Sequence, residues 1–177
     1  MKWILFWGLF WVVALEGTAQ KYVAEKSSIT FFSDALIEDI KAVNTTGASI
    51  LNVQTSDLVF SVPIREFQFR KKLMQEHFNE KYLESDKYPK ATFSGRLVDF
   101  DPAQKNSQSV KAKGKLNIHG IAREVEIDGT AVAGDIIILS SKFKIRLADY
   151  KIEIPQLMFR NIAEEVEVTL EFIYKPQ

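Results

Sequence analysis

The stretch Val110–Ile118, which reads VKAKGKLNI, alternates small or apolar residues with polar ones, most of them lysines. Later in the chain, Glu124–Ala131 (EVEIDGTA) and Glu165–Phe172 (EVEVTLEF) alternate in the same way, with mainly acidic residues at the polar positions. Because successive side chains of a strand point to opposite faces, each stretch predicts a strand with one apolar and one solvated face. This pattern is typical of antiparallel sheets, since parallel sheets are usually buried on both faces.

Further strands and one helix follow from the rest of the chain. Lys142–Leu147 alternates clearly, and less regular strands are expected at Ser28–Ser33, Ile37–Thr45, Asp57–Val62 and Lys90–Phe100. Arg70–Tyr82 predicts a helix, because Met74, Phe78 and Tyr82 recur every fourth residue. We therefore predict an all-β fold, an antiparallel barrel of about eight strands with one short helical insertion. Closure removes sheet edges, and a barrel of this size can hold one small ligand. A filled two-sheet sandwich has the same periodicity and stays an alternative.

The first 19 residues have the layout of a secretory signal peptide. Lys2 precedes the apolar run Trp3–Leu15, and the small residues Gly17 and Ala19 stand before Gln20. This arrangement predicts cleavage after Ala19, a single mature domain over residues 20–177, and a periplasmic or secreted location. The apolar run is shorter than the roughly 20 residues of a spanning helix, so no stable membrane span is expected.

Composition excludes several classes of function. The 177 residues include 23 basic and 23 acidic side chains, so no net charge attracts nucleic acid. Lys111, Lys113 and Lys115 share one face of a predicted strand, opposite the apolar face, and Glu124 and Glu126 on the next strand are their expected partners. The absence of cysteine rules out disulfides, thiolate metal sites and a cysteine nucleophile.

Two segments resemble the YceI-like family of exported bacterial proteins. The first is Leu73–Phe93, with the sequence LMQEHFNEKYLESDKYPKATF, and the second is Gly114–Val125, with the sequence GKLNIHGIAREV. The segment from Phe143 through Asp149-Tyr150 and Ile154-Pro155 to the last strand is similar too. The resemblance covers about Tyr22 to Tyr174. It implies an extended, lipocalin-like barrel, and some members of the family carry a polyisoprenoid chain in a hydrophobic channel.

The resemblance and the apolar face together predict a lipid-binding protein and not an enzyme. A long apolar chain, a polyisoprenoid or an isoprenoid quinone, would lie in the channel for transport or storage. The expected channel-lining residues lie on the predicted inner face, the helix and the late loop: Phe60, Met74, Phe78, Phe93, Leu116, Ile118, Phe143, Ile145, Met158 and Phe159. The helix is expected to cap or gate the channel. Ordinary core packing explains any one of these residues equally well.

Polar candidates are few. His77, Tyr150 and Arg160 are the expected contacts for a lipid headgroup. His119-Gly120 falls between two strands, which predicts a hairpin turn whose histidine binds backbone groups. We predict no metal, no catalytic residues, and no cofactor other than a bound isoprenoid lipid. The alternatives are a structural or stress-related envelope protein with a packed core and, less favoured, a small-barrel enzyme that modifies lipids. A homodimer through an edge strand stays open.

Overall fold

The computed structural model describes residues 21–34, 39–154 and 163–177. The predicted signal peptide lies outside these ranges. The strands are β1 Lys21–Ser33, β2 Ile40–Asn44, β3 Ala48–Asn52, β4 Asp57–Pro63, β5 Gln68–Phe69, β6 Lys90–Val98, β7 Gln108–Ile118, β8 Ile121–Val132, β9 Ile137–Arg146 and β10 Glu165–Pro176. The helical segments are η1 Ile64–Glu66, α1 Lys72–His77, η2 Phe78–Tyr82 and η3 Leu147–Tyr150.

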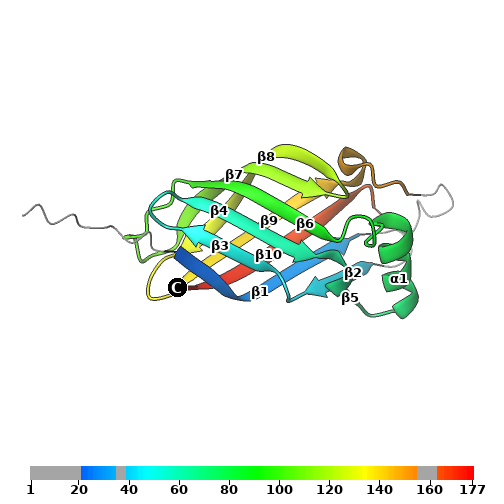
Figure 1. The fold of residues 1–177 in the computed structure, drawn as a ribbon, viewed down its shortest axis with the longest axis horizontal. Helices are drawn as coiled ribbons and strands as arrows, with labels where there is room; N and C mark the ends of the chain where they lie inside the picture. Colours follow the sequence, from blue (N-terminus) through cyan, green and yellow to red (C-terminus); the bar gives the residue numbers. More distant parts are fainter. Residues whose placement is uncertain (1–20, 35–38, 155–162) are drawn as a thin grey trace, which may run out of the picture.

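The strands form a closed antiparallel barrel, as predicted (Figure 1). Strands β6 to β10 follow one another around the wall in chain order, and β4 pairs with β6. Closure comes from β1 and β10, which pair from Tyr22–Pro176 to Phe32–Glu167. This pairing excludes the filled two-sheet sandwich. The homodimer itself stays a prediction.

One of the eight strand positions around the barrel is occupied by two short strands, β2 and β3. β2 pairs with the second half of β1 and β3 pairs with its first half, so the two lie end to end. Between them, the Asn44 side chain accepts a hydrogen bond from the Thr46 amide at 2.8 Å and donates one to the Pro63 carbonyl at 2.7 Å. Within the described residues the predicted strand Ile37–Thr45 covers Ile40–Asn44, and β3 was not predicted, because the break at residues 45–47 interrupts the alternation.

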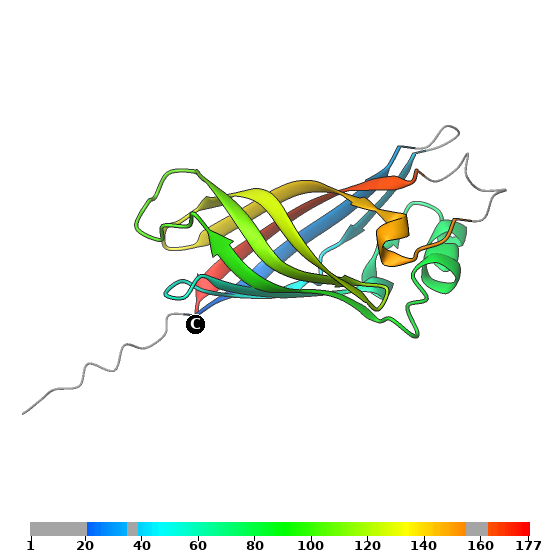
Figure 2. The same cartoon turned by 90° about the horizontal axis from the view of Figure 1, so that it is seen from above.

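The predicted helix Arg70–Tyr82 is confirmed with small changes at its start. α1 begins at Lys72, and the chain continues directly into η2, a π-helical turn in which the Leu83 amide donates to the Phe78 carbonyl at 2.9 Å. The helix lies at one end of the barrel, on the right in Figure 1, and Figure 2 places it at the same end. We call this the helix end.

The outer face of the barrel carries the predicted ion pairs. Lys111 lies 2.8 Å from Glu126 and 3.0 Å from Asp128, and Lys113 lies 2.9 Å from Glu126. Lys115 faces Glu124 at 3.8 Å. Lysines of β7 therefore pair with acids of β8 in solvent, and the basic row is a solvated outer surface.

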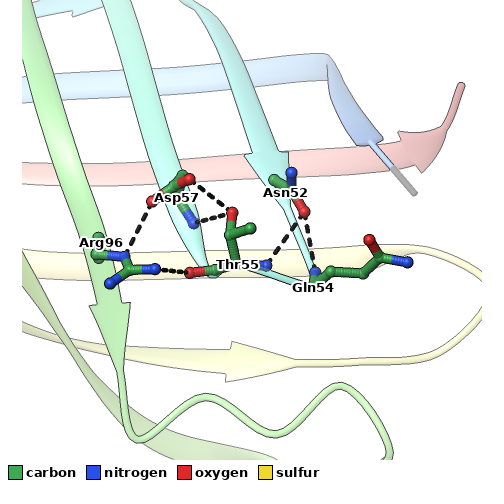
Figure 3. Close-up of polar contacts among 5 residues, drawn as sticks. All are labelled: Asn52, Gln54, Thr55, Asp57 and Arg96. Carbon is green, nitrogen blue, oxygen red and sulfur yellow. Dashed lines mark hydrogen bonds and ion pairs between the residues drawn. The ribbon is translucent and has the colours of Figure 1, made fainter. Parts of the chain in front are cut away.

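Polar contacts hold the β3–β4 turn at the end of the barrel opposite the helix (Figure 3). Asn52 accepts hydrogen bonds from the amides of Gln54 and Thr55. Arg96 of β6 donates to Asp57 at 3.0 Å and to the Thr55 carbonyl at 2.9 Å. The turn is thereby fastened to a third strand.

Candidate functional site

The interior of the barrel has two different halves. In the half next to the helix end, the structure encloses a cavity of about 300 Å³. In the opposite half, Tyr22, Leu51, Ile137 and Tyr174 are almost fully buried and do not line that cavity. We call these the hollow half and the packed half. A volume of about 300 Å³ lies at the small end of the usual range for ligand pockets, roughly 300–1,000 Å³.

The cavity wall is almost entirely apolar. Strands β1, β4, β7, β9 and β10 supply half of the lining residues, and most of the others come from the helix and the segments near it. The lining residues are Ile29, Phe31, Ser33, Ile40, Phe60, Val62, Ile64, Phe67, Phe69, Met74, His77, Phe78, Tyr82, Leu83, Ala91, Leu116, Ile118, Phe143, Ile145, Leu147, Ile152, Ile154, Val166, Val168, Leu170 and Phe172. None of these is an acid, a lysine or an arginine, so within the described part of the chain the wall offers no charge to a phosphate or a carboxylate.

Four phenylalanines hold the helix against the end of the cavity. Phe78 stacks on Phe31 of β1 with ring centroids 5.3 Å apart, and it also meets Phe67 at 5.7 Å and Phe69 at 4.9 Å. We call Phe31, Phe67, Phe69 and Phe78 the helix-end cluster. Edge-to-face and stacked contacts of this kind add to the free energy of burial. The helix is therefore anchored by one ring that also forms part of the cavity wall.

Three side chains supply the polar atoms of the wall. They are Ser33, His77 and Tyr82, and burial raises the pKa of Tyr82, so its phenol stays neutral. The Ser33 hydroxyl already accepts a hydrogen bond from the Ala163 amide at 2.9 Å. A hydroxyl, an imidazole and a phenol suit a neutral hydrogen-bonding group better than an anionic one.

His119 joins three segments at the helix end. It and Gly120 form the predicted hairpin turn between β7 and β8, and both have positive φ. The His119 ring lies 3.1 Å from the Tyr150 carbonyl through Nδ1 and 2.9 Å from the Glu84 carboxylate through Nε2. Because a carbonyl only accepts, Nδ1 donates. The prediction of a turn histidine that binds backbone is confirmed, and His119 has a structural role.

The predicted lining residues fall into three groups. Seven lie on the wall of the large cavity: Phe60, Met74, Phe78, Leu116, Ile118, Phe143 and Ile145. Phe93 is only 2% exposed and lines instead a second cavity of about 30 Å³ in the packed half. Met158 and Phe159 lie outside the described residues.

The three predicted headgroup contacts are also separated. His77 lies on the cavity wall, next to the helix-end cluster. Tyr150 is buried and is absent from the wall, and burial raises the pKa of its phenol. Arg160 lies outside the described residues. Of the two that the structure describes, His77 reaches the cavity and Tyr150 does not.

Sequence reasoning missed the largest aromatic contribution to the wall. Phe31 lies on β1, while Phe67 and Phe69 lie in the short segment between η1 and α1. Neither segment shows clear alternation, which is why these rings were not expected. The one feature of the sequence that could have pointed to Phe67 and Phe69 is that they stand close together just before the predicted helix.

The described residues show no group of three histidines, acids or cysteines that would hold a metal ion. No helix within those ranges is long and apolar enough to cross a bilayer. Within the described residues the site is thus an apolar cavity with three polar side chains on its wall, and its physical capacity is to bind an apolar molecule by burial.

The sequence matches the model of the YceI-like domain over residues 21–174. The chain belongs to the YceI-like family. A solved polyisoprenoid binding domain from Saccharophagus degradans, implicated in plant cell wall breakdown, is 16% identical with a TM-score of 0.76 and covers 88% of this chain and 98% of its own. BcnA of Burkholderia cenocepacia is 14% identical with a TM-score of 0.70 and covers 83% of this chain and 95% of its own.

The YceI protein of Campylobacter jejuni is more distant in shape. It is 14% identical with a TM-score of 0.55 and covers 100% of this chain and 99% of its own. No match was found among curated proteins. At these identities the solved structures establish the fold, which agrees with the resemblance seen in Leu73–Phe93 and Gly114–Val125.

Proposed function

We propose that this YceI-like protein is an exported carrier that holds the apolar chain of an isoprenoid lipid in its hollow half and performs no chemistry on it. The observation that carries the proposal is the cavity of about 300 Å³, on whose wall the described residues contribute only Ser33, His77 and Tyr82 as polar side chains. A packed structural core is the alternative, and it would leave no such cavity.

Burial alone is sufficient to drive binding of such a chain. Each CH₂ group that leaves water contributes roughly 0.8 kcal/mol, so a chain needs no charged anchor to bind in the micromolar range. Support for an isoprenoid over other lipids comes from family membership and from the polyisoprenoid binding domain of Saccharophagus degradans. The uncharged hydroxyls of Ser33 and Tyr82 on the wall favour an alcohol or a quinone at the bound end.

Export is part of the proposal and is supported by residues 1–19, whose pattern is that of a cleaved leader. A carrier of this kind would move or store an isoprenoid outside the cytoplasm. N-terminal sequencing of the protein isolated from its own host should find Gln20 as the first residue.

Native mass spectrometry of that material tests the binding proposal. We expect a stoichiometric adduct that is removed by organic extraction and whose mass fits repeating isoprene units. A bare protein that also takes up no prenyl alcohol, quinone or fatty acid after delipidation would contradict the proposal and favour a structural role in the envelope.

A further inference from the structure

A layer of aromatic side chains separates the two halves of the barrel. The large cavity of about 300 Å³ and the small one of about 30 Å³ share three wall residues, Phe60, Leu170 and Phe172. These residues face the hollow half on one side and the packed half on the other. They therefore occupy the boundary at which the large cavity ends.

The rings at this boundary contact one another across the interior of the barrel. Phe60 of β4 stacks on Phe93 of β6 with centroids 5.2 Å apart and an interplanar angle of 13°. Phe60 also meets Phe172 of β10 at 5.9 Å. β10 is not a neighbour of β4 in the sheet, since β1 and β3 lie between them on the shorter way around the wall. The contact between Phe60 and Phe172 thus crosses the interior.

Gly95 explains why Phe93 belongs to this layer and not to the wall of the large cavity. A Cβ atom at Gly95 would lie 2.8 Å from the tip of the Phe93 ring, which real atoms do not allow. The ring therefore lies over the bare backbone of Gly95, on the packed side, while its face supports Phe60. We call Phe60, Phe93 and Phe172 the aromatic floor.

We propose that the aromatic floor sets the length of the chain that the protein accepts, with Phe60 as the residue that closes the way into the packed half. This inference rests on the proposed function and adds a specificity determinant to it. The floor stops the chain, so carbons beyond the capacity of the hollow half stay near the helix end and contribute little affinity.

The volume of the cavity sets the expected limit. An engineered apolar cavity of about 150 Å³ accepts benzene, which has six carbons. A cavity of about 300 Å³ therefore holds roughly a dozen carbons, between two and three isoprene units. Each additional buried CH₂ group raises affinity roughly fourfold, and that increase should end where the cavity is full.

The test measures dissociation constants for geraniol, farnesol and geranylgeraniol, with ten, fifteen and twenty carbons, on delipidated protein. For the wild type we expect a clear gain from geraniol to farnesol and a difference of less than about threefold from farnesol to geranylgeraniol. Phe60→Ala joins the two cavities and should make geranylgeraniol bind at least about tenfold tighter than farnesol.

Leu139→Ala is the matched control. Leu139 lines the small cavity but not the large one, so its removal enlarges the space behind an intact floor. Like the wild type, this variant should bind farnesol and geranylgeraniol with nearly equal affinity. Thermal unfolding checks that each variant is folded, and Phe60→Leu replaces Phe60→Ala if the alanine variant does not fold.

The outcomes separate the two proposals. A wild-type protein that binds none of the three alcohols contradicts the proposed function itself. Binding that strengthens steadily up to twenty carbons in the wild type overturns the length limit alone. The length limit is also overturned if Phe60→Ala binds farnesol and geranylgeraniol equally well, or if Leu139→Ala binds geranylgeraniol much more tightly than farnesol. In either case the floor would not control access to the packed half.

Discussion

The hollow half and the packed half differ although the same strands build both. β10 shows this most clearly, because its inward residues in chain order are Val166, Val168, Leu170, Phe172 and Tyr174. Val166, Val168 and Leu170 line the large cavity, Phe172 stands at the boundary, and Tyr174 is fully buried beyond it. The alternation places every one of these side chains inside. Their size then decides whether the interior is a cavity or a core.

Two buried hydroxyls in the packed half satisfy each other. The Tyr174 hydroxyl lies 2.7 Å from the Ser49 hydroxyl, which in turn lies 2.8 Å from the Val59 carbonyl. Because that carbonyl only accepts, Ser49 donates to it and accepts from Tyr174. Burial raises the pKa of Tyr174, so the phenol stays protonated and the chain of hydrogen bonds is complete. The hollow half leaves His77 and Tyr82 on the cavity wall instead.

The largest effect on stability is expected at the aromatic floor. Phe93 is 2% exposed and stacks on Phe60, so Phe93→Ala should lower the free energy of unfolding by about 3–5 kcal/mol. Urea denaturation followed by circular dichroism measures it. A loss below about 1 kcal/mol would mean that this layer is not close-packed, and the distinction between the halves would fail.

A charge in the helix-end cluster should act mainly on the hollow half, through both stability and lipid uptake. Phe78→Asp places a carboxylate among Phe31, Phe67 and Phe69, at a cost of about 3 kcal/mol, and it should abolish uptake of farnesol. Leu73 lies on the same helix and is 61% exposed, so Leu73→Asp is the control and should bind normally. If lipid uptake and stability of Phe78→Asp equalled those of the wild type, the helix would not close the cavity.

Two leucines compare the halves directly. Leu51 is 0% exposed in the packed half, while Leu116 is 3% exposed and lines the cavity. Replacement of Leu51 by alanine should cost about 4 kcal/mol and the same change at Leu116 about 2 kcal/mol, since Leu116 has no neighbours on its cavity side. Equal losses in chemical denaturation would indicate that the hollow half is packed as tightly as the other.

The smallest effect concerns the exposed turn at the packed end. A hydrogen bond from Thr55 and the nearby Arg96 hold the pKa of Asp57 below its ordinary value of 3.8. A carboxyl group whose pKa is lower in the folded than in the unfolded state stabilises the fold at pH values above its unfolded-state pKa. That contribution is lost as the pH falls through its folded-state pKa. Asp57→Asn should therefore unfold slightly earlier in urea at neutral pH and match the wild type in strong acid. If the difference in urea stability between Asp57→Asn and the wild type grew as the pH fell, the Asp57 carboxylate would not stabilise the fold in this way.

The sequence predicted the barrel because alternation records which way each side chain points. The ion pairs of Lys111, Lys113 and Lys115 with β8, and the hairpin at His119-Gly120, followed from the same reasoning. The end-to-end arrangement of β2 and β3 did not, because it depends in part on the hydrogen bond from Asn44 to the carbonyl of Pro63, which is distant in sequence.

The direction in which the side chains point does not predict which half of the interior is hollow and which is packed. Phe60 and Phe93 occupy equivalent inward positions on paired strands, yet Phe60 borders both cavities and Phe93 only the small one. Gly95 decides that difference, and its effect depends on the close approach of β6 and β7 in three dimensions. The increase in size along β10 was visible in the sequence, and it is the one signal that predicts which end is hollow.

Methyl-resolved NMR during a titration with farnesol tests the central claim most directly. The methyl resonances of Leu116, Ile118 and Ile145 in the hollow half should shift, while those of Leu51, Leu58 and Ile137 in the packed half should stay in place. Shifts confined to the packed half, or to the exposed Ile50 and Val59 on the outer face, would contradict an interior site at the helix end.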